Sequence, residues 1–126
     1  MNLVVDASAG FELVLETVQG QSMLAKVPSG AEWWAPEHYY IEVAGAIRRA
    51  EYRRAIQSAE ATAGFERLQR ARLHRVQVRP LLERAWSRRG HLTIADAVYM
   101  VLAEEIEATL ITGDLNLART RADRAN

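Results

Sequence analysis

Short apolar runs alternate with longer amphipathic stretches along the chain. The runs at 2–5, 33–35 and 109–112 are too short for helices and are typical of buried strands, whereas 73–78 alternates apolar and polar residues as a partly exposed strand does. Between them, apolar positions three and four residues apart predict helices. These predicted helices cover residues 7–17, 21–27, 36–51, 55–71, 80–90 and 94–107, followed by a short one at 114–118.

The order of these elements predicts the fold class. Strands that alternate with helices across short connections are typical of an α/β fold, here a three-layer fold with a mainly parallel central sheet flanked by helices. In the helix predicted at 36–51, Ile41, Ala44 and Ile47 recur every three residues and are expected to face the core. The most apolar helix follows Thr93, a favourable N-cap residue.

Composition indicates one globular domain over residues 1–126, with 49% hydrophobic and 25% charged residues. The absence of cysteine excludes disulfides and thiolate zinc sites and fits a reducing cytoplasm. No apolar run approaches the roughly 18 residues that a membrane span needs, and the first residues lack the basic segment of a secretion signal. We therefore expect a soluble, cytoplasmic protein that does not insert into membranes.

Charge is unevenly distributed although the net charge is zero. Residues 48–89 contain twelve arginines and four glutamates, a net charge of +8, and the remainder of the chain carries −8. Such a basic segment is either a surface that binds a polyanion or a set of solvated helix faces. Charge alone leaves both interpretations open.

Two acidic residues follow predicted strands. Asp6 comes directly after the strand at 2–5, and Asp114 follows the strand at 109–112 after a single glycine. The carboxyl ends of parallel strands meet at one edge of a sheet, which is where ligands bind in open α/β folds. Alternatively, each aspartate only caps the helix that follows it.

Two further acidic residues lie in apolar helical segments, with no basic residue three or four positions away. Asp96 interrupts the most apolar helix, and Glu42 lies between Ile41 and Val43. A carboxylate buried there would have no local salt bridge. The alternatives are a favourable interaction of Asp96 with the helix dipole, and a structural or solvent-exposed role for Glu42.

Several acids drawn to one sheet edge repel one another unless a cation neutralises them. The chain has no cysteine and no pair of histidines at metal-ligand spacing. Oxygen ligands alone favour Mg²⁺ or Mn²⁺ over Zn²⁺, and these ions support phosphoryl chemistry. The four acids therefore predict a divalent metal site.

Four short motifs, in this order and spacing over almost the whole chain, resemble a known family. They are Val5-Asp6-Ala7-Ser8, Ile41-Glu42-Val43, Thr93-Ile94-Ala95-Asp96-Ala97-Val98-Tyr99 with Leu102-Ala103-Glu104, and Ile111-Thr112-Gly113-Asp114 leading to Leu117-Ala118. The sequence is similar to a PIN domain, specifically to the small VapC-type toxins of type II toxin–antitoxin pairs.

The resemblance implies an endoribonuclease that depends on Mg²⁺ or Mn²⁺ and hydrolyses RNA phosphodiester bonds. Asp6, Glu42, Asp96 and Asp114 would form its acidic pocket, with Asp6, Asp96 and Asp114 as the metal ligands. A bound metal would lower the pKa of a coordinated water and screen the charge of the scissile phosphate.

Three polar residues beside these acids would support the pocket. The hydroxyls of Ser8 and Thr112 would position a carboxylate or a phosphate, although ordinary turn and cap hydrogen bonding is the alternative. Asn116 stands near the position where many relatives have a further aspartate. We therefore expect one well-held metal ion rather than an assured pair.

The same resemblance implies several partners. These are an RNA substrate such as a tRNA or an rRNA loop, an antitoxin protein that covers the toxin, and a second copy of the chain in a homodimer. Candidates for contacts with RNA phosphates are the arginines Arg48, Arg49, Arg53 and Arg54.

Other functions remain open at this point. A PIN-like module that only binds RNA or protein, or a housekeeping RNA-processing nuclease, would share the same motifs. A phosphatase with Asp6 as its nucleophile would generally have a second aspartate where this chain has Ser8. A signalling module phosphorylated on aspartate would need a lysine late in the chain, and Lys26 is the only lysine.

Overall fold

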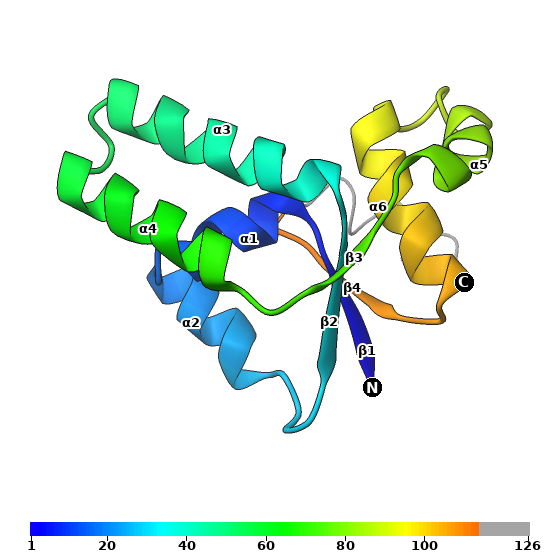
Figure 1. Cartoon of the computed structure of the whole chain (residues 1–126), viewed down its shortest axis with the longest axis horizontal. Coiled ribbons are helices and arrows are strands. Elements are labelled where there is room, and N and C mark those ends of the chain that lie inside the picture. The colour runs from blue at the N-terminus through cyan, green and yellow to red at the C-terminus, as the bar shows by residue number, and fades with distance from the viewer. Residues whose placement is uncertain (114–126) are drawn as a thin grey trace.

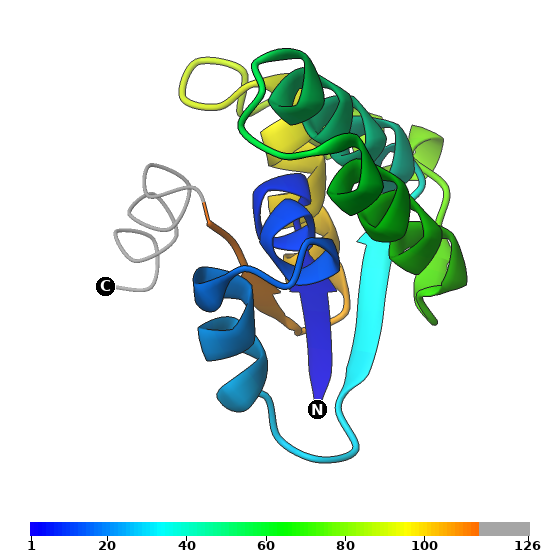
Figure 2. The same ribbon diagram turned by 90° about the vertical axis from the view of Figure 1, so that its left-hand side faces the viewer.

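A parallel sheet forms the centre of the molecule in the computed structural model, which describes residues 1–113. Its strands stand in the order β3-β2-β1-β4, and every described pair of neighbours runs parallel. Figure 2 shows β1 between β4 and β2. The strands are β1 (Asn2–Val5), β2 (Glu32–Pro36), β3 (His74–Val76) and β4 (Thr109–Ile111).

Helices cover both faces of this sheet, so the predicted three-layer α/β fold is confirmed. The helices form two groups on opposite sides of the sheet (Figure 1). The first group is α1 (Ala7–Val14), α2 (Val18–Ala25), α3 (His38–Tyr52) and α4 (Ser58–Arg70). The second group is α5 (Leu82–Trp86) and α6 (Ile94–Glu105), and α5 is preceded by a single 3₁₀ turn, η1 (Arg79–Leu81).

The helix α6 and the strand β1 are the most deeply buried elements. Every residue of α6 from Ala97 to Ala103 is buried, and so are Leu3, Val4 and Val5 of β1. The helix packs against both β1 and β2. As predicted, Thr93 is the N-cap of α6, and its side chain accepts a hydrogen bond from the backbone N–H of Asp96. No helix in the part of the chain that the structure describes is long and apolar enough to cross a membrane.

The helix predicted at 7–17 ends earlier, at Val14. Glu16 has a φ of 53°, in the left-handed region, which turns the chain sharply before α2. The side chain of Thr17 then caps α2 by accepting a hydrogen bond from the N–H of Gly20 at 3.0 Å. An added Cβ at Gly20 would lie 2.2 Å from the carbonyl oxygen of Glu12, so α2 packs directly on the backbone at the end of α1.

The helix predicted from residue 36 begins two residues later, because sheet pairing extends through Pro36. Pro36 pairs with Val76, and the backbone N–H of Glu37 donates to the carbonyl of Val76 at 2.8 Å. The chain therefore stays extended until β3 has been paired. The helix α3 starts at His38.

The predicted core face of this helix was wrong for Ile41, which is 74% exposed. The residues of α3 that are buried are Tyr39, Val43, Ile47 and Ala50. Their spacing of four, four and three residues follows the helix period, and a residue two positions from Tyr39 lies on the opposite side. Ile47 belongs to both the predicted core residues and the buried residues of the structure. A regular spacing of three residues falls short of the helical period of about 3.6, and it was therefore misleading for Ile41.

The single helix predicted at 80–90 is replaced by the turn η1, the five-residue helix α5 and further turns. Beyond Trp86 the backbone N–H groups of Arg88 and Arg89 donate to carbonyls three residues earlier, which tightens the chain out of the α-helical pattern. Ala85 is buried while Trp86 is 59% exposed, so only one side of this short helix meets the core.

Candidate active site

The carboxyl ends of the strands and the first turns of α1, α3 and α6 meet at one edge of the sheet (Figure 1). A pocket of about 510 Å³ opens there, and Asp6, Glu42 and Asp96 all line it. Asp6 follows β1, Glu42 lies in the second turn of α3, and Asp96 lies in the first turn of α6. Three carboxylates far apart in the sequence therefore share one pocket.

Asp6 is fixed by the local structure around it. The residue is 2% exposed, and its Oδ1 atom accepts hydrogen bonds from Ser8 Oγ at 2.7 Å and from the N–H of Ala9 at 2.9 Å. Its own N–H donates to the carbonyl of Ile111 in β4 at 3.1 Å. Asp6 thus caps α1 and also lines the pocket.

Ser8 links the two chain segments that form the edge of the pocket. Its Oγ donates to Asp6 and accepts a hydrogen bond from the N–H of Gly113 at 2.8 Å. The hydroxyl of Thr112 lies 3.4 Å from the same oxygen. Both hydroxyls singled out in the sequence therefore lie beside Asp6, with Ser8 in direct contact and Thr112 behind it.

Glu42 is held by a residue of another helix. Its Oε1 accepts a hydrogen bond from Tyr99 Oη at 2.7 Å, and His38 Nε2 lies 3.6 Å from the same oxygen. Burial, followed by the hydrogen bond to Glu42 and its charge, raises the pKa of Tyr99 far above its ordinary value. The tyrosine is therefore the proton donor in this contact.

Asp96 occupies the third position of α6 and is partly buried. Its backbone N–H donates to Thr93 Oγ1 at 3.2 Å, so the cap of the helix fixes the backbone that carries the carboxylate. The position lies near the positive end of the helix dipole, which favours an ionised side chain.

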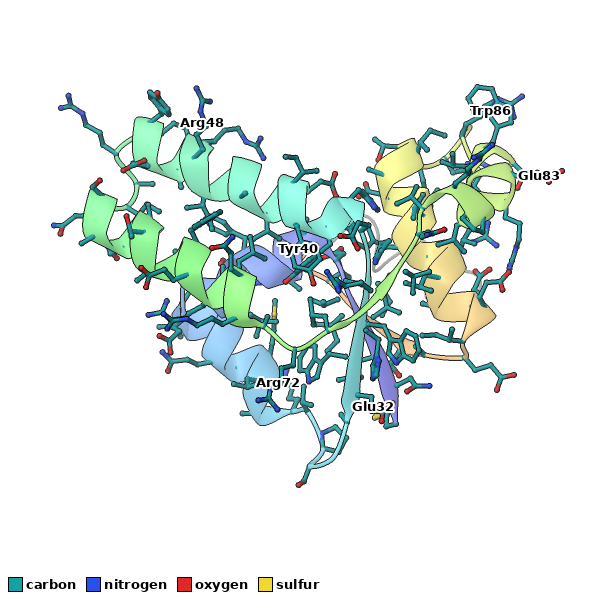
Figure 3. All side chains as sticks on the ribbon, viewed as in Figure 1. Glu32, Tyr40, Arg48, Arg72, Glu83 and Trp86 are labelled. Carbon is teal, nitrogen blue, oxygen red and sulfur yellow. The ribbon has the colours of Figure 1, made fainter. Side chains whose placement is uncertain are left out.

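The four candidate arginines do not share one environment. Arg49 and Arg53 line the pocket, and Arg48 and Arg54 are not among the lining residues. The guanidinium of Arg48 instead stacks over the ring of Tyr52 at 4.4 Å and projects from the outer face of α3 (Figure 3). The structure thus separates two pocket arginines from two outer ones.

Asp114 and Asn116, the remaining predicted site residues, lie outside the described residues. Within residues 1–113, no three acidic or histidine side chains lie close enough together to hold a metal ion by themselves. Mg²⁺ keeps several waters and commonly uses one or two carboxylates. A donor set of carboxylates with neighbouring hydroxyls and no thiolate fits such a hydrated hard ion.

Sequence reasoning gave no role to several residues of the pocket. Tyr99 lies three residues after Asp96 and therefore on the same side of α6, and a tyrosine in an apolar helix needs a partner for its hydroxyl. That signal was available in the sequence. Glu12 and Gln19 also line the pocket, and no pattern in the sequence pointed to either.

Comparison with known proteins identifies the family of this chain. The family model of the PIN domain matches residues 3–123. Ribonuclease VapC12 of Mycobacterium tuberculosis is 35% identical over 123 residues, which cover 98% of this chain and 95% of the relative. Ribonuclease VapC3 of the same organism is 36% identical over 117 residues, covering 93% and 85% of the two chains.

Solved structures show the same fold at lower sequence identity. The crystal structure of M. tuberculosis VapC20, described as a toxin that cleaves the sarcin-ricin loop, superposes with a TM-score of 0.70 at 15% identity over 94% of each chain. PAE2754 from Pyrobaculum aerophilum gives a TM-score of 0.64 at 21% identity, covering 93% of this chain and 77% of that one. Together with the family model and the identity to the curated relatives, these matches show that the chain belongs to the PIN-domain family, among the VapC ribonucleases.

Proposed function

We propose that this protein is a metal-dependent endoribonuclease and the toxin of a type II toxin–antitoxin pair. The observation that carries the proposal is the shared pocket of Asp6, Glu42 and Asp96, with Arg49 and Arg53 in the same lining. Acids can hold a cation, and arginines can hold a phosphate, so one pocket offers both parts that phosphodiester hydrolysis needs. The ribonuclease names of the relatives support the same reaction class.

Asp6 and Asp96, together with Asp114, are the proposed ligands of Mg²⁺ or Mn²⁺. When bound, such an ion lowers the pKa of a coordinated water and balances negative charge at the phosphate. The protein's own part is to hold Asp6 rigid through Ser8 and the N–H of Ala9. A fixed carboxylate loses little entropy when it takes up a ligand.

Glu42 is the proposed acceptor for the proton of the attacking water. A carboxylate in this role must lie within hydrogen-bond reach of the water and remain ionised. Glu42 lines the pocket and is partly exposed, and its Oε1 accepts a hydrogen bond from the hydroxyl of Tyr99. These features suit a general base that exchanges protons with solvent.

The proposed partners follow from the same assignment. They are a folded RNA such as a tRNA or an rRNA loop, an antitoxin protein that silences the nuclease, and a second copy of the chain in a homodimer. Large apolar side chains are exposed on the surface, among them Ile41 and Trp86, and would be covered in such assemblies. The proposed location is the cytoplasm, where these RNAs are found.

Metal removal tests the proposal directly. The purified protein is incubated with total RNA in the presence of Mg²⁺, of Mn²⁺ or of excess EDTA, and the products are resolved on a denaturing gel. We expect discrete cleavage with either metal, loss of cleavage in EDTA, and recovery when metal is added back. Cleavage that persists in EDTA would rule out the metal mechanism, and binding of RNA without cleavage in any metal would favour a silent binding module.

The two pairs of arginines provide a second prediction. Replacing Arg49 and Arg53 together by glutamine should raise KM for RNA by about tenfold at moderate salt, because two phosphate contacts in the pocket are lost. The same replacement of Arg48 and Arg54 removes equal charge from the same end of α3 and should raise KM clearly less. The measurement is KM as a function of salt concentration, whose slope should become shallower mainly in the pocket variant. Equal effects of the two pairs would show that charge acts only at long range.

A further inference from the structure

Two helices that carry acids of the pocket are joined by a small polar cluster of His38, Glu42 and Tyr99. Tyr99 Oη of α6 donates to Glu42 Oε1 of α3 at 2.7 Å. His38 Nε2 of α3 lies 3.2 Å from the carbonyl oxygen of Ala95 in α6. The rings of His38 and Tyr99 pack at 4.6 Å between centroids with an angle of 38°. These contacts cross between α3 and α6 in both directions.

The hydroxyl of Tyr99 acts in this cluster only as a donor. Tyr99 is 1% exposed, and its ring is part of the hydrophobic core. Burial and the neighbouring carboxylates raise its pKa, so the hydroxyl keeps its proton. A protonated hydroxyl beside an ionised carboxylate makes a charge-assisted hydrogen bond, which is stronger and more directional than one between neutral groups.

The tautomer of His38 follows from its partners. A backbone carbonyl only accepts hydrogen bonds, so Nε2 carries the hydrogen that points to Ala95. In the neutral ring Nδ1 is then a bare acceptor, and it is buried without a hydrogen-bond partner among residues 1–113. A buried acceptor left unpaired costs free energy, so hydrogen bonding satisfies only one of the two ring nitrogens. The ring also packs on Tyr99 and lies beside Glu42 Oε1.

Both neighbours of Glu42 approach the same oxygen. Tyr99 and His38 lie at Oε1, while Oε2 makes no hydrogen bond within the part of the chain that the structure describes. A carboxylate anchored through one oxygen has its plane and its rotamer restricted, and the other oxygen keeps its capacity to accept a proton or a hydrogen bond from a ligand in the pocket.

We infer that Tyr99 and His38 are positioning residues for the reaction: Tyr99 anchors Glu42 through Oε1, and His38 fixes the ring of Tyr99 and the spacing between α3 and α6. The inference rests on the proposed function, because Glu42 must act in the pocket for its orientation to matter. Tyr99 lines the pocket beside Glu42, and in this inference both residues act through Glu42 rather than on the reacting atoms. Their effect is to hold the carboxylate in the productive geometry before RNA binds.

The test is a comparison of Tyr99→Phe with Tyr40→Phe under single-turnover and steady-state conditions. Phenylalanine keeps the buried ring of residue 99 and removes only the hydroxyl. Tyr40 is a tyrosine of α3 that lines a separate groove beside β3 rather than the acidic pocket (Figure 3). We expect kcat of Tyr99→Phe to fall by about tenfold with KM changed by less than about twofold, because orientation is lost and RNA binding is not. Tyr40→Phe should cleave at the wild-type rate.

A double-mutant cycle separates positioning from a general loss of structure. If Tyr99 acts through Glu42, then Tyr99→Phe should lower kcat in the wild-type background and have no further effect in a Glu42→Ala background. A merely structural role would lower kcat by the same factor in both backgrounds. Equal factors, or a Tyr99→Phe variant with wild-type kcat, would overturn the inference.

His38 is tested by rescue. His38→Ala removes the ring and should lower kcat by about three- to tenfold, whereas His38→Gln restores a donor that can reach the carbonyl of Ala95 and should recover part of the loss. Absence of any loss in His38→Ala would remove His38 from the assignment. The wild-type protein with and without EDTA is run in parallel, since cleavage that resists EDTA defeats the proposed function itself and not only this inference.

Discussion

Replacing Asp96 by asparagine is expected to lower kcat for RNA cleavage by about a hundredfold or more, since even outer partners of a metal site commonly contribute ten- to a hundredfold. The substitution keeps the shape of the side chain and removes its charge and one anionic ligand oxygen. Asp96 lies at the pocket together with Asp6 and Glu42, so its loss also lowers the negative charge that would hold the cation. The measurement is kcat at several Mg²⁺ concentrations, and the concentration for half-maximal activity should rise in parallel.

Stability provides the control for this variant. The favourable interaction of Asp96 with the helix dipole contributes about 0.3–1 kcal/mol, so the thermal midpoint should shift only slightly. Glu83→Gln makes the same chemical change on α5, at the outer end of the molecule (Figure 3), and should cleave RNA at the wild-type rate. An Asp96→Asn protein that remains fully active would remove this carboxylate from the metal site.

The second large effect is expected at Gly20, where replacement by alanine should lower the free energy of unfolding by about 2 kcal/mol. Inside a helix this replacement normally stabilises by about 1 kcal/mol, because glycine has the poorer helix propensity. Here the new Cβ would lie 2.2 Å from the carbonyl oxygen and 2.6 Å from the carbonyl carbon of Glu12, both backbone atoms. The helices α1 and α2 must therefore separate for the side chain to fit.

Thermal and denaturant unfolding measure this prediction, with a drop of about 10 °C in the midpoint expected for a domain of this size. Gly90→Ala is the matched control, because Gly90 is exposed and a Cβ added there meets nothing within 4 Å. Its effect should stay within about 0.5 kcal/mol. A Gly20→Ala protein as stable as the Gly90→Ala protein would show that α2 adjusts its position without cost.

Local patterns in the sequence were enough to predict the boundaries of those elements that are bounded by signals in adjacent residues. The helix α6 was predicted from residue 94 because Thr93 caps it and an unbroken apolar stretch follows, and the structure begins it at Ile94. The strand β1 was likewise bounded by Asp6, which ends the apolar run and caps the next helix. In both cases the boundary signal lies in the adjacent residue.

Elements that depend on distant partners were predicted less well. Pro36 was placed near the start of a helix, since proline is favourable there, yet pairing with Val76 keeps it in β2. That pairing joins residues 40 positions apart, and no local pattern reports it. The exposed Ile41 has the same origin, because the side of α3 that meets the core is decided by where α1 and α4 pack.

The acids of the pocket could be selected from the sequence, but their environments could not. Asp6 and Asp96 stood out by position, and the structure places them with Glu42 in one pocket. The contact that holds Glu42 joins residues 57 positions apart on two helices. Charge composition likewise indicated a group of arginines but could not distinguish Arg49 from Arg48. The rotation of α3 about its axis decides which of the two side chains faces the pocket and which faces outward.

The position of β4 beside β1 has a consequence for the order of events during protein synthesis. Asp6 and Ser8 are synthesised early. The groups that fix them, the carbonyl of Ile111 and the N–H of Gly113, follow much later, because Ser8 and Gly113 are 105 positions apart. At typical elongation rates this gap lasts about 5 to 20 s. Throughout that interval the nascent chain carries Asp6 and Ser8 without the strand that closes the sheet edge around them. The complete pocket thus belongs only to chains whose translation has passed Gly113.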